Sequence, residues 1–448
     1  MLMGKRWISL LLLLTGIITD NAYAAEQELS LRDALLQALK GNPEIRANER
    51  GLLAVKEDVS IARSFLLPKI TFEERFMRTN SPTYVFMSKL NQERFEATDF
   101  AVSSLNDPDP LSDFQTSMSF EQPLFAPKAY IGTDMAKKDY EAKGEDVGRK
   151  REEVVFAVFR TYLDAQTARI FVSVTEKGIE DAQEHLRIAE RRYNAGLGLF
   201  SDMLRAEVAL RTAEKRLVSA EKNLMVGKRA LGLMLGLVES IDVEDQRPFL
   251  ILKDLDHYSQ MAQSRKDLKG MEARYNNAEN NLRMANAAYL PTVGMGGSYQ
   301  MNSHKSAFGE EGESWQVMAF LRWELFDGLR RESERQKAKE KLAEAGEYLD
   351  GMKKQVSFDV YEAYLSVEEA RKGLELARAN LISAEEGRRL VKTRYENSLS
   401  TAVDMLDVQT NLDAARADVV AREAAYLTAI ARISYQSGTI MKDLDIER

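Results

Sequence analysis

Two aspartates, Asp404 and Asp407, stand three residues apart in a segment that begins a helix in the last part of the chain. This spacing places both carboxylates on one face of a helix. Around the axis of a trimer they would form a ring of six carboxylates, which attracts cations and raises its own proton affinity through like-charge repulsion. A capping role is the alternative, because Thr401 and Asp404 have the spacing of a capping box and aspartate is common in a first helical turn. We favour the ring, and the two roles are compatible.

Other residues that could support catalysis or metal binding are scattered. His185, His257 and His304 are isolated and lack the spacing of metal ligands, so we interpret them as structural. The chain has no cysteine, which excludes disulfides, thiol chemistry and lipid attachment through cysteine. The sequence contains no nucleophile elbow, phosphate-binding loop or paired catalytic acid and base. We therefore expect no enzyme, no cofactor and no metal, and the 18 dispersed methionines fit gap-filling packing better than copper export.

An internal repeat sets the position of these aspartates. Residues 154–238 and 356–440 align without a gap at an offset of 202, and 21 of the 85 aligned positions are identical. Asp202-Met203-Leu204 recurs as Asp404-Met405-Leu406. The chain therefore contains two copies of one long helical unit, and its function must suit a pseudo-symmetric helical object.

The sequence permits very long helices. It has 9 prolines, none of them between Lys128 and Arg247 or from Thr292 to the C-terminus, and proline breaks a helix interior. A helix over 128–200 would span roughly 110 Å at ~1.5 Å per residue. Interruptions at 193–201 and 395–401 predict tight turns between two antiparallel helices in each unit.

Apolar residues at alternating steps of three and four predict coiled-coil packing: Met203, Ala206, Leu210, Ala213, Leu217, Ala220 and Leu224, then Met405, Val408, Leu412, Ala415 and Val419.

Four stretches alternate apolar and polar residues with the period of a two-faced strand. They lie near 69–78, 114–121, 293–301 and 315–325. Lengths near ten residues suit tilted transmembrane strands, and the hairpins of a soluble sandwich are the alternative. We expect a long loop, 80–112, within the first pair and a shorter polar loop, 302–314, within the second.

The N-terminus has the features of a secretory signal peptide, with basic Lys5 and Arg6, an apolar segment at 7–18 and an A-x-A cleavage site at 22–24. A membrane anchor is the alternative, but the apolar run is short and a processing site follows it.

The net charge of −8 argues against nucleic-acid binding. No other run approaches the roughly 20 apolar residues of a spanning helix, so entry of the mature chain into a membrane would require a β-barrel.

These signals divide the chain into eight segments. They are the signal peptide 1–24, N-terminal helices 25–67, a first barrel hairpin 68–123, the first helical unit 124–240, a linker and helix 241–290, a second barrel hairpin 291–326, the second helical unit 327–440 and a tail 441–448.

Two hairpins per chain leave exposed strand edges, which lipid does not permit. Two chains would give eight strands and a barrel filled by its own side chains, whereas three would give twelve and room for a water-filled lumen. We therefore predict a mainly α chain with a transmembrane β-barrel portion: long antiparallel coiled-coil helices, four strands per chain and a twelve-stranded barrel completed by a homotrimer.

Over essentially its whole mature length the chain resembles the TolC-like outer-membrane efflux proteins. The resemblance rests on the repeat, on Leu-Pro breaks at 67–68 and 290–291, on Leu325-Phe326-Asp327-Gly328, and on the tip blocks 192–196 and 395–400. It implies a trimeric channel-tunnel of a Gram-negative bacterium, with a barrel in the outer membrane above a helical tunnel in the periplasm. It also implies docking with a periplasmic adaptor (membrane fusion) protein and an inner-membrane efflux or ABC-type transporter, for efflux or type I secretion. A soluble periplasmic coiled-coil scaffold or adaptor is the alternative, against which the strand stretches argue.

The resemblance also assigns roles to single residues. Asp404 and Asp407 match an aspartate pair that lines the constricted entrance of the family's tunnel, which opens by an iris-like realignment of the tip helices. Asp202 and Tyr395 match two participants in polar links that hold the entrance shut, and the position of a basic partner falls on Ser400, so one link is missing or replaced. An ordinary helix cap is the alternative for Ser201 and Asp202.

Overall fold

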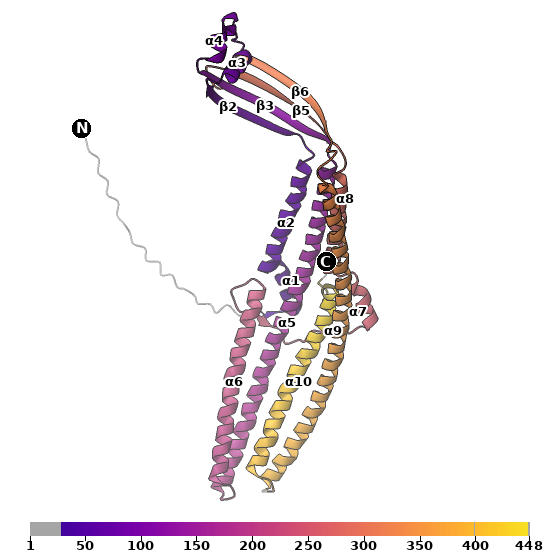
Figure 1. Ribbon diagram of the computed structural model, residues 1–448. Coiled ribbons are helices and arrows are strands. Elements are labelled where there is room, and N and C mark those ends of the chain that lie inside the picture. The colour runs from indigo at the N-terminus through magenta and orange to yellow at the C-terminus, as the bar shows by residue number, and fades with distance from the viewer. Residues whose placement is uncertain (1–27, 398, 447–448) are drawn as a thin grey trace, which may run out of the picture.

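A computed structural model describes residues 28–397 and 399–446 of the chain. The molecule is elongated, with a curved sheet at one end and long helices that run from it to two hairpin tips at the other (Figure 1). The expected signal peptide, residues 1–24, lies outside the described residues. Among the helices that the structure describes, none combines the length and the apolar character needed to cross a membrane.

Each copy of the repeat forms a hairpin of one very long helix and one shorter helix. Helices α5 (Pro127–Asn194) and α9 (Arg330–Glu396) have 68 and 67 residues, so each is about 100 Å long at ~1.5 Å per residue. Helices α6 (Phe200–Met234) and α10 (Ala402–Gln436) each have 35 residues and return beside them (Figure 1). The helical repeat predicted from the sequence is confirmed, with tips at residues 195–199 and 397–401.

The predicted apolar stripe faces the neighbouring helices. Ala206 and Ala220 of α6 are buried, as are Met405, Leu412 and Ala415 of α10. Small residues set how closely the helices approach, because a Cβ added to Gly227 of α6 would lie 3.3 Å from the Cα of Ala165 in α5. Close helix packing thus follows from the alternation of large and small residues.

The main core lies in the middle of the molecule, around the upper part of the hairpins. There α1 (Leu31–Gly41) and α2 (Pro43–Ser64) pack on α5, and two short strands, β1 (Glu28–Leu29) and β4 (Asp242–Val243), pair in parallel. Phe159, Tyr162 and Leu163 of α5 are fully buried in this core. The Tyr162 hydroxyl donates to the Leu29 carbonyl at 2.9 Å, so the start of the described chain is attached to α5.

A second layer joins the two repeats. Helix α8 (Lys266–Ala287) packs along both α5 and α9, α7 (Leu255–Ala262) lies against α9, and α11 (Ile440–Asp443) follows α10. Buried Tyr258 of α7 packs with Val360 of α9 and Ile433 of α10. The upper part of each hairpin is therefore enclosed by other helices, whereas the lower part extends beyond them (Figure 1).

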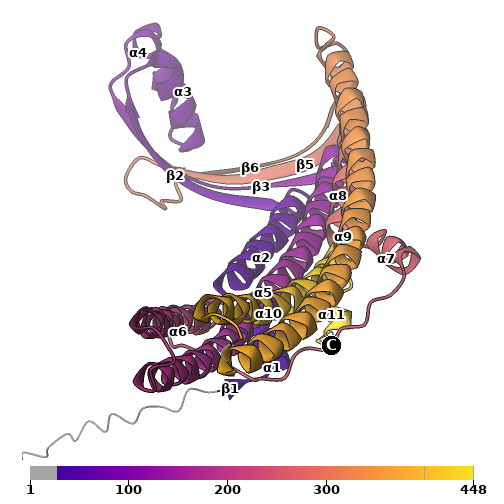
Figure 2. The same cartoon turned by 90° about the horizontal axis from the view of Figure 1, so that it is seen from below.

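The four alternating stretches form one antiparallel sheet in the order β2-β3-β5-β6, which confirms the strand prediction. The strands are β2 (Lys69–Thr79), β3 (Leu111–Phe125), β5 (Thr292–Ser303) and β6 (Gly312–Arg322). Seen from below, the sheet is a single curved layer that extends away from the helices (Figure 2). Strands β2 and β6 are its two edges.

The connection between β2 and β3 is not the plain loop expected at 80–112. It contains α3 (Pro82–Asn91) and α4 (Val102–Asn106), which lie at the end of the sheet remote from the hairpins (Figure 1). The rings of Phe86, Phe95 and Phe100 meet edge to face at 4.8 and 5.1 Å. This small apolar cluster gives the connection a core of its own, which is why it folds.

The two faces of the sheet differ in chemistry. Residues paired across an antiparallel sheet share a face, so Phe72, Met118, Tyr299 and Trp315 form one exposed apolar row. The next row, on the opposite face, is polar: Glu73, Ser117, Gln300 and Ser314. A sheet with one apolar and one polar face follows from the period-2 sequence.

The two joints between sheet and hairpins are built differently. Strand β3 passes through Ala126 into Pro127 at the first position of α5, where proline is suited to begin a helix. Strand β6 instead reaches α9 through Gly328 and Leu329, with φ of 71° and 65°. Asp327 lies against this corner and pairs with Arg331 at 3.1 Å.

Candidate functional site at the hairpin tips

The predicted site residues lie at the ends of the two hairpins, at the opposite pole of the molecule from α3 and α4 (Figure 1). The first tip turns at Gly196, whose φ of 69° lies in the left-handed region that glycine adopts at the lowest cost. The second turns between Glu396 and Ala402. Ser398, which belongs to the second tip block, lies outside the described residues.

Asp404 caps the helix that it begins. Its amide donates to the Thr401 hydroxyl at 3.1 Å, and its Oδ2 accepts the Thr401 amide at 2.9 Å. This reciprocal pair is the predicted capping box. Ser400 also donates its hydroxyl to Asp404 Oδ2 at 3.0 Å. The hydrogen bond from the Thr401 amide, followed by those of the Thr401 and Ser400 side chains, lowers the pKa of Asp404.

Asp407 lies one turn further along α10 and is exposed, like Asp404. The two carboxylates differ in their surroundings, because no hydrogen bond or ion pair to Asp407 occurs within residues 28–397 and 399–446. The Asp404 carboxylate is hydrogen-bonded within the cap of its own helix, whereas the Asp407 carboxylate faces solvent.

Tyr395 connects the second tip to the first through Arg192. The Tyr395 side chain is 5% exposed, and the Arg192 guanidinium lies over its ring with Cζ 4.6 Å from the centroid. Arg192 also donates to the Tyr395 carbonyl and, at 3.3 Å, to the Leu197 carbonyl. Burial raises the pKa of the Tyr395 hydroxyl; the charge of Arg192 opposes this effect and that of Asp202 adds to it.

Asp202 lies near Tyr395, but no hydrogen bond joins the two within the described part of the chain. The alternative role of Ser201 and Asp202 as a helix cap is wrong, because α6 begins at Phe200 and its N-cap is Leu199, without a side-chain hydrogen bond. Asp202 instead lies in the first turn of α6, where a carboxylate interacts favourably with the helix dipole. Leu199 aligns with Thr401 in the repeat, so the two tips share a capping position but not a capping residue.

A buried polar cluster that the sequence pattern does not predict lies above the tips. Asp181 of α5 accepts hydrogen bonds from Arg388 of α9 at 3.0 Å, from Arg416 of α10 at 2.9 Å and from Gln409 of α10 at 3.1 Å. Burial alone would raise the pKa of Asp181, but the hydrogen bond of Arg416 and the charges of both arginines outweigh it and lower the pKa. One carboxylate thus links the first hairpin to both helices of the second.

His185 lies one turn from Asp181 and completes this cluster. Its Nε2 is 3.1 Å from Gln409 Oε1, and its buried Nδ1 has no hydrogen-bond partner among the residues that the structure describes. Burial lowers the pKa of His185, although the contact with Gln409 acts in the opposite sense. A groove of about 480 Å³ lies beside it between α5, α6 and α10, with Leu204 and Val208 in its wall.

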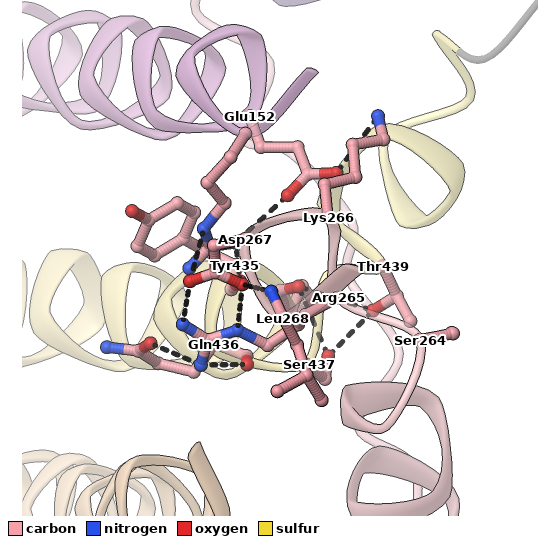
Figure 3. A network of polar contacts seen from close by, with 12 residues as sticks. Glu152, Ser264, Arg265, Lys266, Asp267, Leu268, Tyr435, Gln436, Ser437 and Thr439 are labelled. Carbon is pink, nitrogen blue, oxygen red and sulfur yellow. Dashed lines mark hydrogen bonds and ion pairs between the residues drawn. The ribbon is translucent and has the colours of Figure 1, made fainter. Parts of the chain in front are cut away.

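The upper ends of the hairpins are joined by a second polar network (Figure 3). Arg265, before α8, donates to Asp267 at 2.6 and 3.0 Å and to the Gln436 carbonyl at the end of α10 at 3.0 Å. Arg149 of α5 pairs with Asp267 at 3.6 Å and with Glu152 at 2.9 Å. The pKa of Asp267 would rise through burial, but Arg265 and Arg149 lower it. This network holds α5, α8 and α10 together at a fixed point above the tips.

The described residues contain no group of three or more His, Cys, Asp or Glu side chains that could hold a metal ion. The tips present carboxylates and an arginine–tyrosine contact, with a groove beside His185 above them.

A two-faced sheet that continues into two helical hairpins, each with a helix about 100 Å long, is the architecture of an outer-membrane channel protein. The chain belongs to the outer membrane efflux protein family, whose model matches residues 34–237 and 257–439. This is a family of channels rather than enzymes, and the protein is located in the outer membrane with its helical part in the periplasm.

Known proteins of similar length match nearly the whole chain. The outer membrane efflux protein BepC of Brucella suis is 22% identical over 441 residues, which is 96% of this chain and 91% of BepC. A membrane protein of Pseudomonas aeruginosa has a similar crystal structure, with a TM-score of 0.78, 20% identity and coverage of 92% and 91% of the two chains. The crystal structure of CusC also gives a TM-score of 0.78, at 14% identity and with 94% and 92% covered. These structural likenesses establish the fold.

Proposed function

We propose that three copies of the chain form a channel-tunnel, in which their sheets close a twelve-stranded barrel and their hairpins enclose a passage below it. The observation that carries the proposal is the sheet with two unlike faces. Its apolar row includes Phe72, Met118 and Trp315, which are 58%, 54% and 76% exposed in the single chain. Such a face is stable against lipid, and the polar row of Ser117, Gln300 and Ser314 suits a water-filled lumen.

The number of copies follows from the sheet edges. Strands β2 and β6 each leave one edge unpaired, and unpaired backbone groups are not tolerated in lipid. Pairing β6 of one copy with β2 of the next removes every edge once the ring closes. Two copies would give a barrel filled by side chains, whereas three leave an open lumen.

The periplasmic entrance is a constriction controlled by the tips in this proposal. Asp404 and Asp407 of three copies supply six carboxylates near one axis. Asp407, which is exposed and has no ion-pair partner within the described part of the single chain, is the residue that acts on passing ions. Asp404 has a second role as a helix cap. The links that hold the entrance shut include Arg192 on Tyr395, with Asp202 close by, and the Ser400 hydroxyl on Asp404.

The channel itself supplies no energy, so it requires partners. We infer a periplasmic adaptor protein and an inner-membrane efflux or ABC-type transporter, which deliver the substrate for efflux or type I secretion. The groove beside His185 and the exposed apolar side chains at the tips, including Leu197 and Leu399 at 68% and 76%, suit the docking of adaptor helices.

Conductance of the purified protein in a planar bilayer tests the proposal, with the particle mass in detergent as an independent measure of the trimer. We expect a cation-selective current that grows or loses its selectivity in Asp407→Asn, which removes one charge per chain without touching the cap. Thr401→Ala is the matched control, because it weakens the cap and leaves both carboxylates.

The outcomes separate the parts of the proposal. Steady channels with equal selectivity in Asp407→Asn and the wild type would retain the channel and reject the aspartate entrance. A protein that is monomeric, soluble without detergent and inactive in bilayers would reject the channel and favour a periplasmic scaffold.

A further inference from the structure

The β2–β3 connection, residues 82–110, is a folded unit at the end of the sheet remote from the tips. Besides its aromatic cluster, it contains an ion pair between Lys89 of α3 and Asp99 at 2.7 Å, with side chains 31% and 19% exposed. Gln92 follows α3 and is 1% exposed. The unit therefore has internal contacts of its own and a defined position on the sheet.

The unit is attached to the polar face of the sheet. Gln92 Nε2 donates to Asp113 Oδ1 at 2.8 Å, and Ser88 donates to Asp113 Oδ2 at 3.4 Å. Asn302 Nδ2 donates to both oxygens of Asp113, at 3.0 and 3.1 Å. By strand register, Asp113 and Asn302 lie on the same face as Gln115, Ser117 and Gln300. The attachment is thus on the side opposite the exposed aromatic row.

A close backbone contact fixes the end of α3 against the same face. Gly312 pairs with Asn302 in the sheet, and a Cβ added to Gly312 would lie 2.0 Å from the Asn91 carbonyl oxygen. Any side chain at position 312 would therefore force α3 away from the sheet. Two hydrogen bonds to Asp113, from Gln92 and Ser88, and the close backbone contact at Gly312 hold the unit on the polar face.

We propose that residues 82–110 form a distal lid, a second constriction inside the mouth of the channel. The inference rests on the proposed barrel, in which the polar face lines the lumen. In a ring of three copies, three such units project inward at the end opposite the aspartates. Their exposed apolar side chains, including Met87, Leu90 and Phe100 at 53%, 48% and 65%, then face one another across the opening.

The lid also carries negative charge. Residues 82–110 contain five acidic side chains and two basic ones, a net charge of −3 per copy; the acidic residues are Glu93, Glu96, Asp99, Asp107 and Asp109, and the basic ones are Lys89 and Arg94. Three copies together place a net charge of −9 at the mouth. A narrow acidic opening favours cations, so the distal lid contributes to cation selectivity independently of Asp404 and Asp407.

Thiol labelling in a bilayer tests the lid directly. The chain has no cysteine, so Leu90→Cys creates one reactive site on α3. A bulky thiol reagent added from the side of the distal mouth is expected to abolish most of the current through Leu90→Cys channels and to leave wild-type channels unchanged. Complete labelling, verified by mass spectrometry, with an unaltered current would overturn the lid.

A second pair of variants tests the attachment. Gly312→Ala is expected to displace α3 and raise the current, whereas Ser314→Ala, on the same face of the same strand, is not. Replacement of 82–110 by a short glycine-serine turn is expected to raise the current and reduce cation selectivity. Equal currents and selectivity in all of these proteins would refute the lid while leaving the channel intact. Absence of current in every protein, wild type included, would reject the barrel and with it the lid.

Discussion

Asp181→Asn is the most informative single substitution in the helical part of the protein. Asparagine keeps the size of the side chain but removes the charge that Arg388 and Arg416 share. Hydrogen bonds to a charged group contribute about 1.5–3 kcal/mol each when they are protected from water. Both arginine side chains are 21% exposed, so water replaces part of each interaction. We therefore expect a total loss of about 2–3 kcal/mol, below most of the range of about 3–6 kcal/mol for two fully protected charged hydrogen bonds.

The loss is local, because Asp181 links α5 to α9 and α10 between the tips and the fixed network around Arg265. Amide hydrogen exchange measured by mass spectrometry reports such local opening. A loss of about 2–3 kcal/mol corresponds to a roughly 30- to 150-fold loss of protection, which we expect in peptides that cover 175–190 of α5. Peptides of the main core around Tyr162 should be unaffected.

Asp413→Asn is the matched control, because it removes the same charge from the same cluster. Asp413 accepts a hydrogen bond from Gln409 at 2.9 Å, which an asparagine oxygen can also accept, and its ion pairs with Arg416 and Arg216 are long, at 3.9 and 4.0 Å; burial raises its pKa. Its loss should cost less than about 0.5 kcal/mol. If Asp181→Asn loses no more protection than Asp413→Asn, the two arginines do not depend on Asp181 and the proposed link between the hairpins is wrong.

The pH dependence supplies an independent check. The pKa of Asp181 is lowered in the folded protein, so its stabilising contribution is complete above the ordinary value near 3.8 and is lost as the pH falls through the lower, folded value. The difference in protection between wild type and Asp181→Asn should therefore be constant from about pH 7 to 8, where the neighbouring His185 is neutral. It should shrink only in acid below the ordinary pKa.

Three further predictions concern the tips and the cluster above them. Thr401→Ala removes the hydroxyl that caps α10 and should cost about 1 kcal/mol, seen as faster exchange of the first amides of α10, whereas Leu199→Thr supplies the missing hydroxyl to α6 and should slow exchange there. Arg192→Met keeps the packing but loses the contact with the Tyr395 ring, worth about 0.5–2 kcal/mol, and should increase bilayer current if that contact holds the entrance closed; an unchanged current would argue against the link. Burial lowers the pKa of His185, so the unfolded chain binds more protons and stability falls as the pH drops below 6.5. His185→Gln should abolish that component of the acid sensitivity of the α5 amides, and an unchanged pH profile would contradict the assignment.

The elements with a strong local period were predictable from the sequence. Period-2 alternation located all four strands of the large sheet, and the two proline-free repeats indicated the hairpins. The capping box at Thr401 was also readable, because its partner Asp404 lies three residues away. The first tip was more ambiguous. The repeat pairs Leu199 with Thr401, yet the polar Ser201 and Asp202 suggested a later start for α6 than the structure has.

The buried cluster and the β2–β3 helices were not predictable in the same way. Asp181 is 207 residues from Arg388 and 235 from Arg416 in the chain, and their contact depends on how three helices pack. Periodicity assigns residues to a face of a helix but does not say which faces meet. In the connection after β2, three phenylalanines at irregular spacing form a core only once the chain has turned. The sequence there has no regular apolar period that would predict the helices.

The unequal joints between sheet and hairpins have a mechanical consequence. A helix about 100 Å long is a lever, and a rotation of its tip applies a torque at its root. At Pro127 the ring fixes φ, which removes one of the rotations by which α5 could turn relative to β3. At the other root, the left-handed conformation of Leu329 costs about 1–2 kcal/mol, and the ion pair of Asp327 with Arg331 lies beside it. The neighbouring Gly328 adopts the same conformation without that cost. The backbone at Gly328 has more rotational freedom than that at Pro127, so the hairpin that carries Asp404 and Asp407 can turn relative to the sheet more easily than the first hairpin.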